Sequence, residues 1–256
     1  MQAQSTIRHQ LESAQKLREI VEAMTFAHPV IGVYDPLDYA WKGFEAYVQR
    51  YGHGPKRVLF LGMNPGPWGM AQTGVPFGEI TTVRDWLDIE EPVGHPDDEH
   101  PSYPIQGLDC HRSEVSGRRL WGLFKERFST PEEFFKDHFV VNYCPLLFLV
   151  ESIRKNGVTG ARNLTPDKLP ASKRRELFDA CDAHLRTVTK ALNPAWIVAI
   201  GTFAEKRAIK AFGPTGPKVV RILHPSPASP MSNRAWPEKV TQCLQENGVW
   251  PSNLIS

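Results

Sequence analysis

Four short apolar runs most constrain what this chain can fold into. They cover residues 57–62, 139–143, 196–200 and 219–223. Their length and continuous apolar character are typical of strands that are buried on both faces of a sheet. Helical spacings of apolar residues separate the later runs. The alternation predicts an α/β fold with a central, mostly parallel four-stranded sheet that is flanked by helices on both faces.

The expected helices have recognisable patterns and ends. Apolar residues recur at helical spacing over 6–26 and again over 171–192. Thr202 is a candidate N-cap for the helix that follows the third apolar run. A last short helix over 236–247 is expected to end at Gly248.

Composition bounds the kind of protein. With 41% hydrophobic residues, of the 256 in the chain, it can bury a core. No run of about 18 apolar residues is present, so no membrane-spanning helix is expected, and the polar N-terminus does not resemble a signal peptide. We expect one domain over 1–256, acting as a monomer. The segment at about 79–104 has eight acidic residues and one basic residue within 79–99, and several prolines, which predicts a solvated excursion.

The cysteines and histidines give no sign of a metal site. The four cysteines are widely spaced, which argues against a zinc site, an iron–sulfur cluster or a disulfide framework: Cys110, Cys144, Cys181 and Cys243. The spacing of His95, His100, Cys110 and His111 fits no standard zinc site. We therefore expect no metal and no cofactor. Free cysteines also favour an intracellular location, which is the cytoplasm for a bacterial protein and the nucleus for a eukaryotic one.

Charge is unevenly distributed along the chain. Residues 1–150 have 14 basic and 20 acidic side chains, whereas residues 151–256 have 16 basic and 8 acidic ones. A basic half favours a polyanionic partner such as a nucleic acid.

Polar residues beside proline follow three of the four predicted strands. The loops are Gly-Met-Asn-Pro-Gly-Pro at 62–67, Asn-Tyr-Cys-Pro at 142–145 and His-Pro-Ser-Pro at 224–227. Each loop alone could be a simple strand-ending turn. The carboxyl ends of parallel strands share one edge of a sheet, where ligands bind, so three such loops together favour a common site.

These loops are also where the chain resembles a known family. GMNPGPWGMAQTGVPFGE (62–79) and HPSPASP (224–230) resemble the two signature motifs of the single-strand-selective monofunctional uracil-DNA glycosylases, which belong to the uracil-DNA glycosylase superfamily. The resemblance continues through SEVSGRRLW (113–121), VVNYCPLLFL (140–149) and NRAW (233–236). It implies hydrolysis of the N-glycosidic bond of uracil in DNA during base-excision repair. An abasic site would remain, without strand cleavage.

The resemblance assigns two catalytic residues. Asn64 matches the residue that orients the attacking water, since its amide oxygen can accept a hydrogen bond. His224 matches the residue that lies against uracil O2 and stabilises the base as it leaves as an anion.

Four further residues match positions that bind the base after it is flipped out of the helix. Asn142 matches the asparagine that reads uracil, accepting from N3–H and donating to O4, and Phe77 matches the aromatic residue that stacks on the base. Met63 matches part of the pocket wall. Gly66 stands where uracil-restricted relatives have a bulky aromatic residue. Its lack of a side chain implies 5-hydroxymethyluracil and related bases as additional substrates.

DNA is the expected partner, single- or double-stranded and containing uracil or modified uracil. Pro67 and Ser226 match the DNA-contacting parts of the two motifs. Ala228 departs from the pattern, because vertebrate members have an arginine there that wedges into the base stack. Met231 and Arg234 are candidates to fill the gap of the flipped base instead. Two other functions remain open: a module that binds damaged DNA without chemistry, and a nucleoside hydrolase.

Overall fold

The central sheet has four parallel strands in the order β3-β2-β6-β7. The computed structural model describes residues 2–153, 157, 159–227 and 234–252. Its strands are β2 (Val58–Gly62), β3 (His138–Asn142), β6 (Trp196–Ile200) and β7 (Lys218–Ile222). All four predicted apolar runs are confirmed as strands to within one residue. β2 is buried at every position and β6 at all but its first, whereas the edge strands β3 and β7 are buried only in part.

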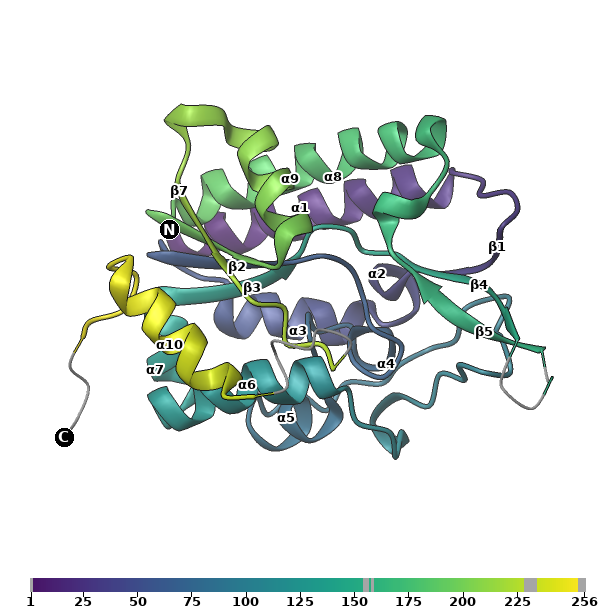
Figure 1. The fold of residues 1–256 in the computed structure, drawn as a ribbon, viewed down its shortest axis with the longest axis horizontal. Helices are drawn as coiled ribbons and strands as arrows, with labels where there is room; N and C mark the ends of the chain where they lie inside the picture. The colour runs from purple at the N-terminus through teal and green to yellow at the C-terminus, as the bar shows by residue number, and fades with distance from the viewer. Residues whose placement is uncertain (1, 154–156, 158, 228–233, 253–256) are drawn as a thin grey trace.

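Helices cover both faces of this sheet, as expected (Figure 1). One layer contains α1 (Gln2–Glu22), α8 (Ala171–Leu192) and α9 (Thr202–Phe212). The other contains α3 (Trp41–Tyr51), α6 (Val115–Phe128), α7 (Pro131–Asp137) and α10 (Trp236–Glu246). The short helices are α2 (Pro36–Tyr39), α4 (Met70–Thr73) and α5 (Ile80–Asp85).

A second sheet was not expected from the sequence. It is antiparallel, in the order β1-β4-β5, and consists of β1 (Val30–Tyr34), β4 (Leu147–Ile153) and β5 (Thr159–Leu164). The pattern of β5, Thr-Gly-Ala-Arg-Asn-Leu, is too polar to indicate a strand alone. Its pairing with the apolar β4 decides its structure.

The predicted helix ends are partly wrong. Thr202 is the first residue of α9 rather than its cap, and Gly201 takes the cap position with φ of 90°. That backbone conformation suits glycine and disfavours threonine. At the end of α10 the prediction is confirmed, since Gly248 has φ of 71° and donates from its amide to Gln245 O at 2.9 Å.

The acidic segment begins differently from the expectation. Glu79 is buried and caps α5, accepting from Thr82 N at 3.0 Å through Oε2. Leu87 and Ile89 are buried in the core. Residues 90–104 contain no helix or strand and are mostly exposed or half-buried. The solvated excursion therefore starts only after Ile89, because the first part of the segment has its own apolar side chains to bury.

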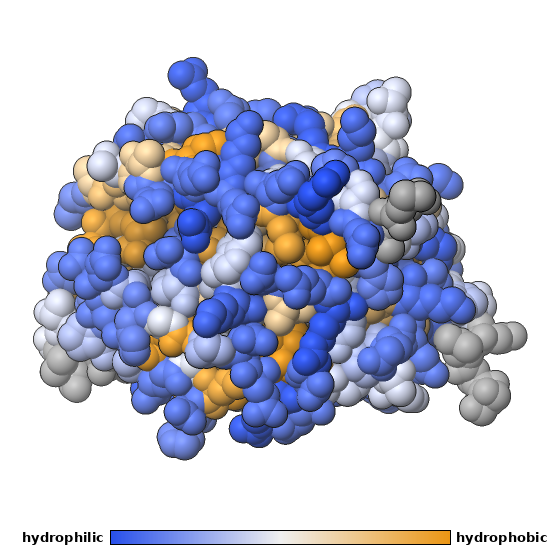
Figure 2. Space-filling model, turned by 180° about the vertical axis from the view of Figure 1, so that it is seen from behind, coloured by the Kyte–Doolittle hydropathy of each residue, from blue (hydrophilic) through white to orange (hydrophobic). Residues whose placement is uncertain are grey.

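The surface is mainly hydrophilic on the face seen in Figure 2, with apolar patches separated by polar side chains. The large hydrophobic residues that are exposed in the described part of the chain are Ile20, Ile31, Ile153 and Ile209. Within the same residues, no helix combines the length and apolar character needed to cross a membrane.

Candidate active site

The three loops predicted to form a site lie at the carboxyl edge of the central sheet. Asn142 is the last residue of β3 and is paired in register with Gly62, the last residue of β2. Asn64 follows β2 by two residues, and His224 follows β7 by two residues. The fold thus places one functional amide at the end of β3, a second just after the neighbouring β2, and an imidazole just after β7 at the far edge of the sheet.

Asn142 offers an unused acceptor beside an aromatic ring. Its Oδ1 is buried and has no hydrogen-bond partner among the described residues, whereas its Nδ2 lies 3.2 Å from Met70 Sδ. A Cβ added to Gly62 would overlap both Asn142 Oδ1 and Cε2 of Phe77. The oxygen and the ring edge therefore meet over Gly62, next to where a stacked base would lie.

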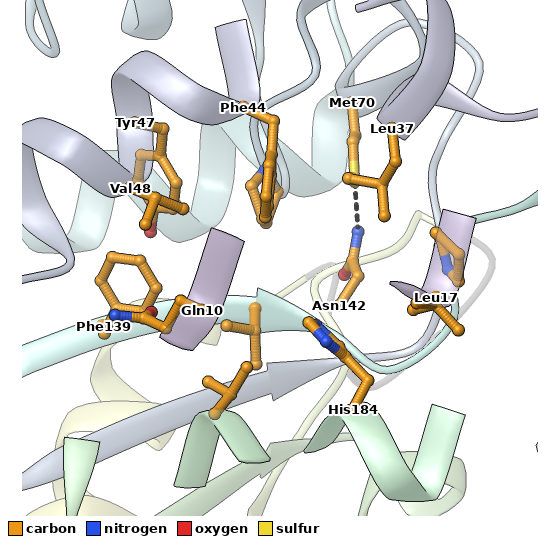
Figure 3. A pocket seen from close by; sticks show the side chains of 14 residues that line it. Gln10, Leu17, Leu37, Phe44, Tyr47, Val48, Met70, Phe139, Asn142 and His184 are labelled. Atoms are coloured by element: carbon orange, nitrogen blue, oxygen red, sulfur yellow. Dashed lines mark hydrogen bonds between the residues drawn. The ribbon is translucent and has the colours of Figure 1, made fainter. Parts of the chain in front are cut away.

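The far side of Asn142 is closed. Figure 3 shows its side chain pointing toward Met70, above a cavity of about 30 Å³ that Phe44 and Phe139 also line. That space holds a water molecule but no pyrimidine. A base must therefore bind on the Phe77 side of the amide.

Phe77 is held in a strained backbone conformation. Its φ is 55°, in the left-handed region that non-glycine residues rarely adopt. Its carbonyl accepts from Trp121 Nε1 at 3.1 Å, and a Cβ on Gly117 would overlap the same carbonyl oxygen. Because both contacts come from α6, that helix fixes the aromatic ring at the site.

His224 is held in one tautomer. The amide of Ser226 donates to Nδ1 at 3.1 Å, so Nδ1 is an acceptor and the proton of the neutral ring is on Nε2. Burial lowers the pKa of His224 to about 4. At neutral pH the ring is therefore an uncharged donor through Nε2. The ring centre lies 6.3 Å from that of Phe77, so the two side chains border the same space.

Two bonds fix the loop that contains His224. Trp236 Nε1 donates to Leu223 O at 2.9 Å, and Arg119 Nη1 donates to Pro225 O at 2.9 Å. The second bond comes from α6, the helix that also holds Phe77.

Asn64 is oriented by the loop between the two sheets. Its Nδ2 donates to Leu146 O at 3.1 Å, just before β4 begins. Its Oδ1 accepts no hydrogen bond from the described residues. The amide is therefore fixed with its acceptor end available for a water molecule.

The space beside Gly66 is not empty. A Cβ on Gly66 would lie 2.5 Å from Oε2 of Glu114 and 2.6 Å from its Cδ. A carboxyl group therefore borders the space that the missing side chain of Gly66 was expected to leave for a substituent. Met63 is half-buried, and its carbonyl accepts from Cys144 N at 2.9 Å.

The predicted DNA-contacting residues are only partly described. Pro67 is half-buried and its carbonyl accepts from Gln72 Nε2 at 2.9 Å. Ser226 is half-buried and orients His224, and Arg234 is exposed. Ala228 and Met231 lie outside the described residues.

Three contributors on or next to α6 were missed by sequence reasoning: Glu114, Arg119 and Trp121. Their only signal was membership in the SEVSGRRLW stretch, which does not show which side chain reaches which loop. As for metals, no group of three or more His, Cys, Asp or Glu residues in the described ranges could hold an ion.

Comparison with known proteins identifies the class of protein. The family model of the Uracil DNA glycosylase superfamily matches residues 50–246, so the chain belongs to that superfamily. The chain belongs to its branch of single-strand selective monofunctional uracil DNA glycosylases. The mouse and rat proteins of that name are each 47% identical over 243 residues, covering 94% of this chain and 84% of theirs, and the bovine protein is 46% identical. In fold, the chain resembles the crystal structure of wild-type SMUG2 from Pedobacter heparinus, with a TM-score of 0.65 at 18% identity, covering 93% of this chain and 97% of that one.

The packing over Gly62 leads to a stability prediction. Gly62→Ala is expected to lower the free energy of unfolding by about 1–3 kcal/mol, because its Cβ overlaps Asn142 and Phe77. Gly122→Ala is the matched control on the exposed face of α6. Nothing lies within 4 Å of its Cβ, so we expect a gain of about 0.5–1 kcal/mol from helix propensity. Urea denaturation measures both free energies of unfolding. Equal changes in the two variants would contradict the crowding over Gly62.

Proposed function

We propose that this protein is a monofunctional glycosylase that hydrolyses the N-glycosidic bond of uracil in DNA and leaves an abasic site, as in base-excision repair. The observation that carries the proposal is the buried, unpartnered Oδ1 of Asn142 beside the ring of Phe77. A buried acceptor without a donor is costly, and uracil N3–H would supply the missing donor.

The other groups complete the recognition of a flipped base. The ring stacks on Phe77, O4 accepts from Asn142 Nδ2, and O2 faces the Nε2–H of His224. Cytosine would present its N3 lone pair to the Asn142 oxygen and its amino group to the Asn142 nitrogen. Both contacts would then be repulsive, which favours uracil.

The bond is cleaved largely before water attacks. As the C1′–N1 bond breaks, its electron pair goes to the base, and the His224 donor stabilises the resulting anion. The sugar becomes an oxocarbenium-like cation, which a water molecule attacks. Asn64 Oδ1 orients that water without taking up its proton. One water is consumed: its oxygen becomes the hydroxyl group on C1′ of the abasic site, which stays in the DNA, and the proton that it loses goes to the uracil anion, which leaves as the free base.

An oligonucleotide assay tests this function. We expect the wild-type chain to release uracil from single-stranded DNA and to leave cytosine intact, with alkali converting abasic sites into strand breaks. Asn142→Ala should lower uracil release by about 10–100-fold, since two hydrogen bonds to the base are lost.

Other outcomes would favour the alternatives. Tight binding of uracil-containing DNA without base release would indicate a damage-binding module. Release of uracil from free deoxyuridine at a comparable rate would indicate a nucleoside hydrolase.

We extend the proposal to the biological setting. The names of the mouse and rat relatives include single-strand selectivity, which supports single-stranded DNA as the preferred form. Double-stranded DNA is proposed as a second substrate. We further propose that the chain acts as one domain and as a monomer. Its location is the nucleus in a eukaryotic cell or the cytoplasm in a bacterial one.

A further inference from the structure

A cationic side chain lies over an aromatic ring beside the site. Trp68 follows Asn64 by four residues, and the guanidinium carbon of Arg112 is 4.3 Å from the centre of the Trp68 ring. Arg112 belongs to the segment before α6, two residues ahead of Glu114. Because the carboxyl group of Glu114 borders Gly66, this segment runs beside the loop that contains Asn64.

Further contacts hold Trp68 in place. Its ring packs against that of Tyr103, with 5.4 Å between the ring centres. The hydroxyl group of Tyr103 donates to a backbone carbonyl of β5 at 3.0 Å, and Gln72 Nε2 donates to Pro67 O at 2.9 Å. Trp68 is half-buried, whereas Arg112 is exposed. The pair therefore presents a planar cation at the protein surface, on a ring that the fold holds in position.

Positive charge is concentrated around this pair. The segment 111–119 is basic, although it lies in the part of the chain that has an acidic excess. Arg112 and Arg118 are exposed, and Arg119 donates to a carbonyl of the loop after β7. The one acidic residue of the segment, Glu114, has a buried carboxyl oxygen. The segment therefore offers positive charge next to the site, where it attracts the phosphates of a DNA strand.

Trp68 is within reach of the nucleotides next to the flipped one. Four residues of chain span at most about 14 Å, which limits the distance between the Cα atoms of Asn64 and Trp68. A DNA strand advances about 3.4 Å per nucleotide in a duplex and further when it is extended. In a duplex the neighbouring bases stay paired and stacked inside the helix. In a single strand they can stack on a protein side chain instead.

We propose that Arg112, held over Trp68, is a stacking site for an unpaired base within two nucleotides of the flipped one in single-stranded DNA. This inference rests on the proposed function. The base lies on the guanidinium group, which is planar and weakly hydrated, and the positive charge attracts the phosphates beside it. The contact adds affinity for a single strand and takes no part in bond cleavage. It is a physical basis for a preference for single-stranded over duplex DNA.

The test compares single strands that differ in one base near the uracil. Each strand contains one uracil. In four of them a propanediol linker replaces one of the two nucleosides on either side, which removes a base and keeps the phosphates. Single-turnover excision at increasing enzyme concentration gives a half-saturating concentration and a maximal rate. On the unmodified strand, Arg112→Ala should raise the half-saturating concentration by about 5–100-fold and leave the maximal rate within about twofold.

Removal of the contacted base should cancel the effect of the substitution. On the strand that lacks this base, Arg112→Ala should raise the half-saturating concentration by less than about threefold, because the stacking partner is already missing. Arg112→Lys keeps the charge without the planar group. It should therefore retain the salt dependence of binding and lose the dependence on the neighbouring base.

A second cation over an aromatic ring provides the matched control. Lys218 Nζ lies 5.0 Å from the ring centre of Trp196. Both residues begin their strands, so they lie at the opposite edge of the central sheet from the site. Lys218→Ala should change neither the half-saturating concentration nor the maximal rate on any strand.

The outcomes separate this inference from the proposed function. If wild type releases no uracil from any strand, the proposed function fails. If wild type releases uracil and Arg112→Ala binds the unmodified strand as tightly as wild type, the inference alone is overturned. An equal loss of affinity on all five strands would also overturn it, because Arg112 would then contact only phosphates. A loss of the same size on fully paired duplex DNA would overturn it as well, since the neighbouring bases are not unpaired there.

Discussion

Replacing Asn64 by alanine is expected to lower the rate of uracil excision by about 10²–10⁴-fold while the protein remains folded. The amide is fixed through Nδ2 by the carbonyl of Leu146, 3.1 Å away, so its oxygen has one orientation. Without that oxygen, the attacking water has no side chain to position it. Single-turnover release of uracil from a single-stranded oligonucleotide measures the loss, because product release does not enter.

A second asparagine provides the control. Asn247 also donates from Nδ2 to a backbone carbonyl, that of Cys243 at 2.8 Å, but it lies at the end of α10. Asn247→Ala should retain the wild-type rate. A wild-type rate in Asn64→Ala would show that the water is positioned by other groups.

Replacing His224 by alanine is expected to lower the rate by about 10²–10³-fold. The side chain supplies one donor to the oxygen on which negative charge develops, and the Ser226 amide fixes that donor on Nε2. The loss should appear in the rate of the chemical step and only weakly in the affinity for DNA. Single-turnover rates at saturating enzyme, together with binding of a non-cleavable oligonucleotide, separate the two.

The pKa of His224 determines the pH profile. Burial lowers this pKa to about 4, so the ring is neutral from pH 8 down to pH 5 and the catalytic donor is unchanged over that range. Wild-type activity should therefore show no inflection near 6.5, the ordinary pKa of histidine. An inflection there that disappears in His224→Ala would contradict a neutral catalytic histidine.

His138 is the matched control for His224. It is also buried, its pKa is also lowered to about 4 by burial, and it begins β3 at the opposite edge of the sheet. His138→Ala should lower the free energy of unfolding, because it leaves a cavity and removes the acceptor for Trp250 Nε1. The rate per folded molecule should not change.

The central sheet could be predicted because its strands have a strong local signal. Val58–Gly62 is buried at every position, so the apolar run alone indicates a strand. The smaller sheet could not be predicted, because Thr159–Leu164 becomes a strand only by pairing with β4. The sequence of residues 159–164 alone does not show that β4 will pair with it.

The site also has a part that the sequence could predict and a part that it could not. The motifs indicated Asn64, Asn142 and His224, and their positions at or after the ends of parallel strands place them at the same edge of the sheet. The orientation of each group depends on distant atoms that no motif contains: Leu146 O for Asn64, Met70 Sδ for Asn142 and the Ser226 amide for His224. Glu114 could not be placed from the sequence, because a glutamate before a helix does not show which loop its carboxyl group will contact.

Helix α6 has two faces with different freedom to vary. Through Trp121 it holds the strained Phe77, and through Arg119 it holds the loop of His224. Substitutions on this inner face would have to be matched by changes in both loops, so lineages should exchange these residues together or keep them. The outer face, with Gly122 and Glu126, contacts neither loop and can drift independently. Among related proteins, the inner face of α6 should therefore change slowly and its outer face quickly.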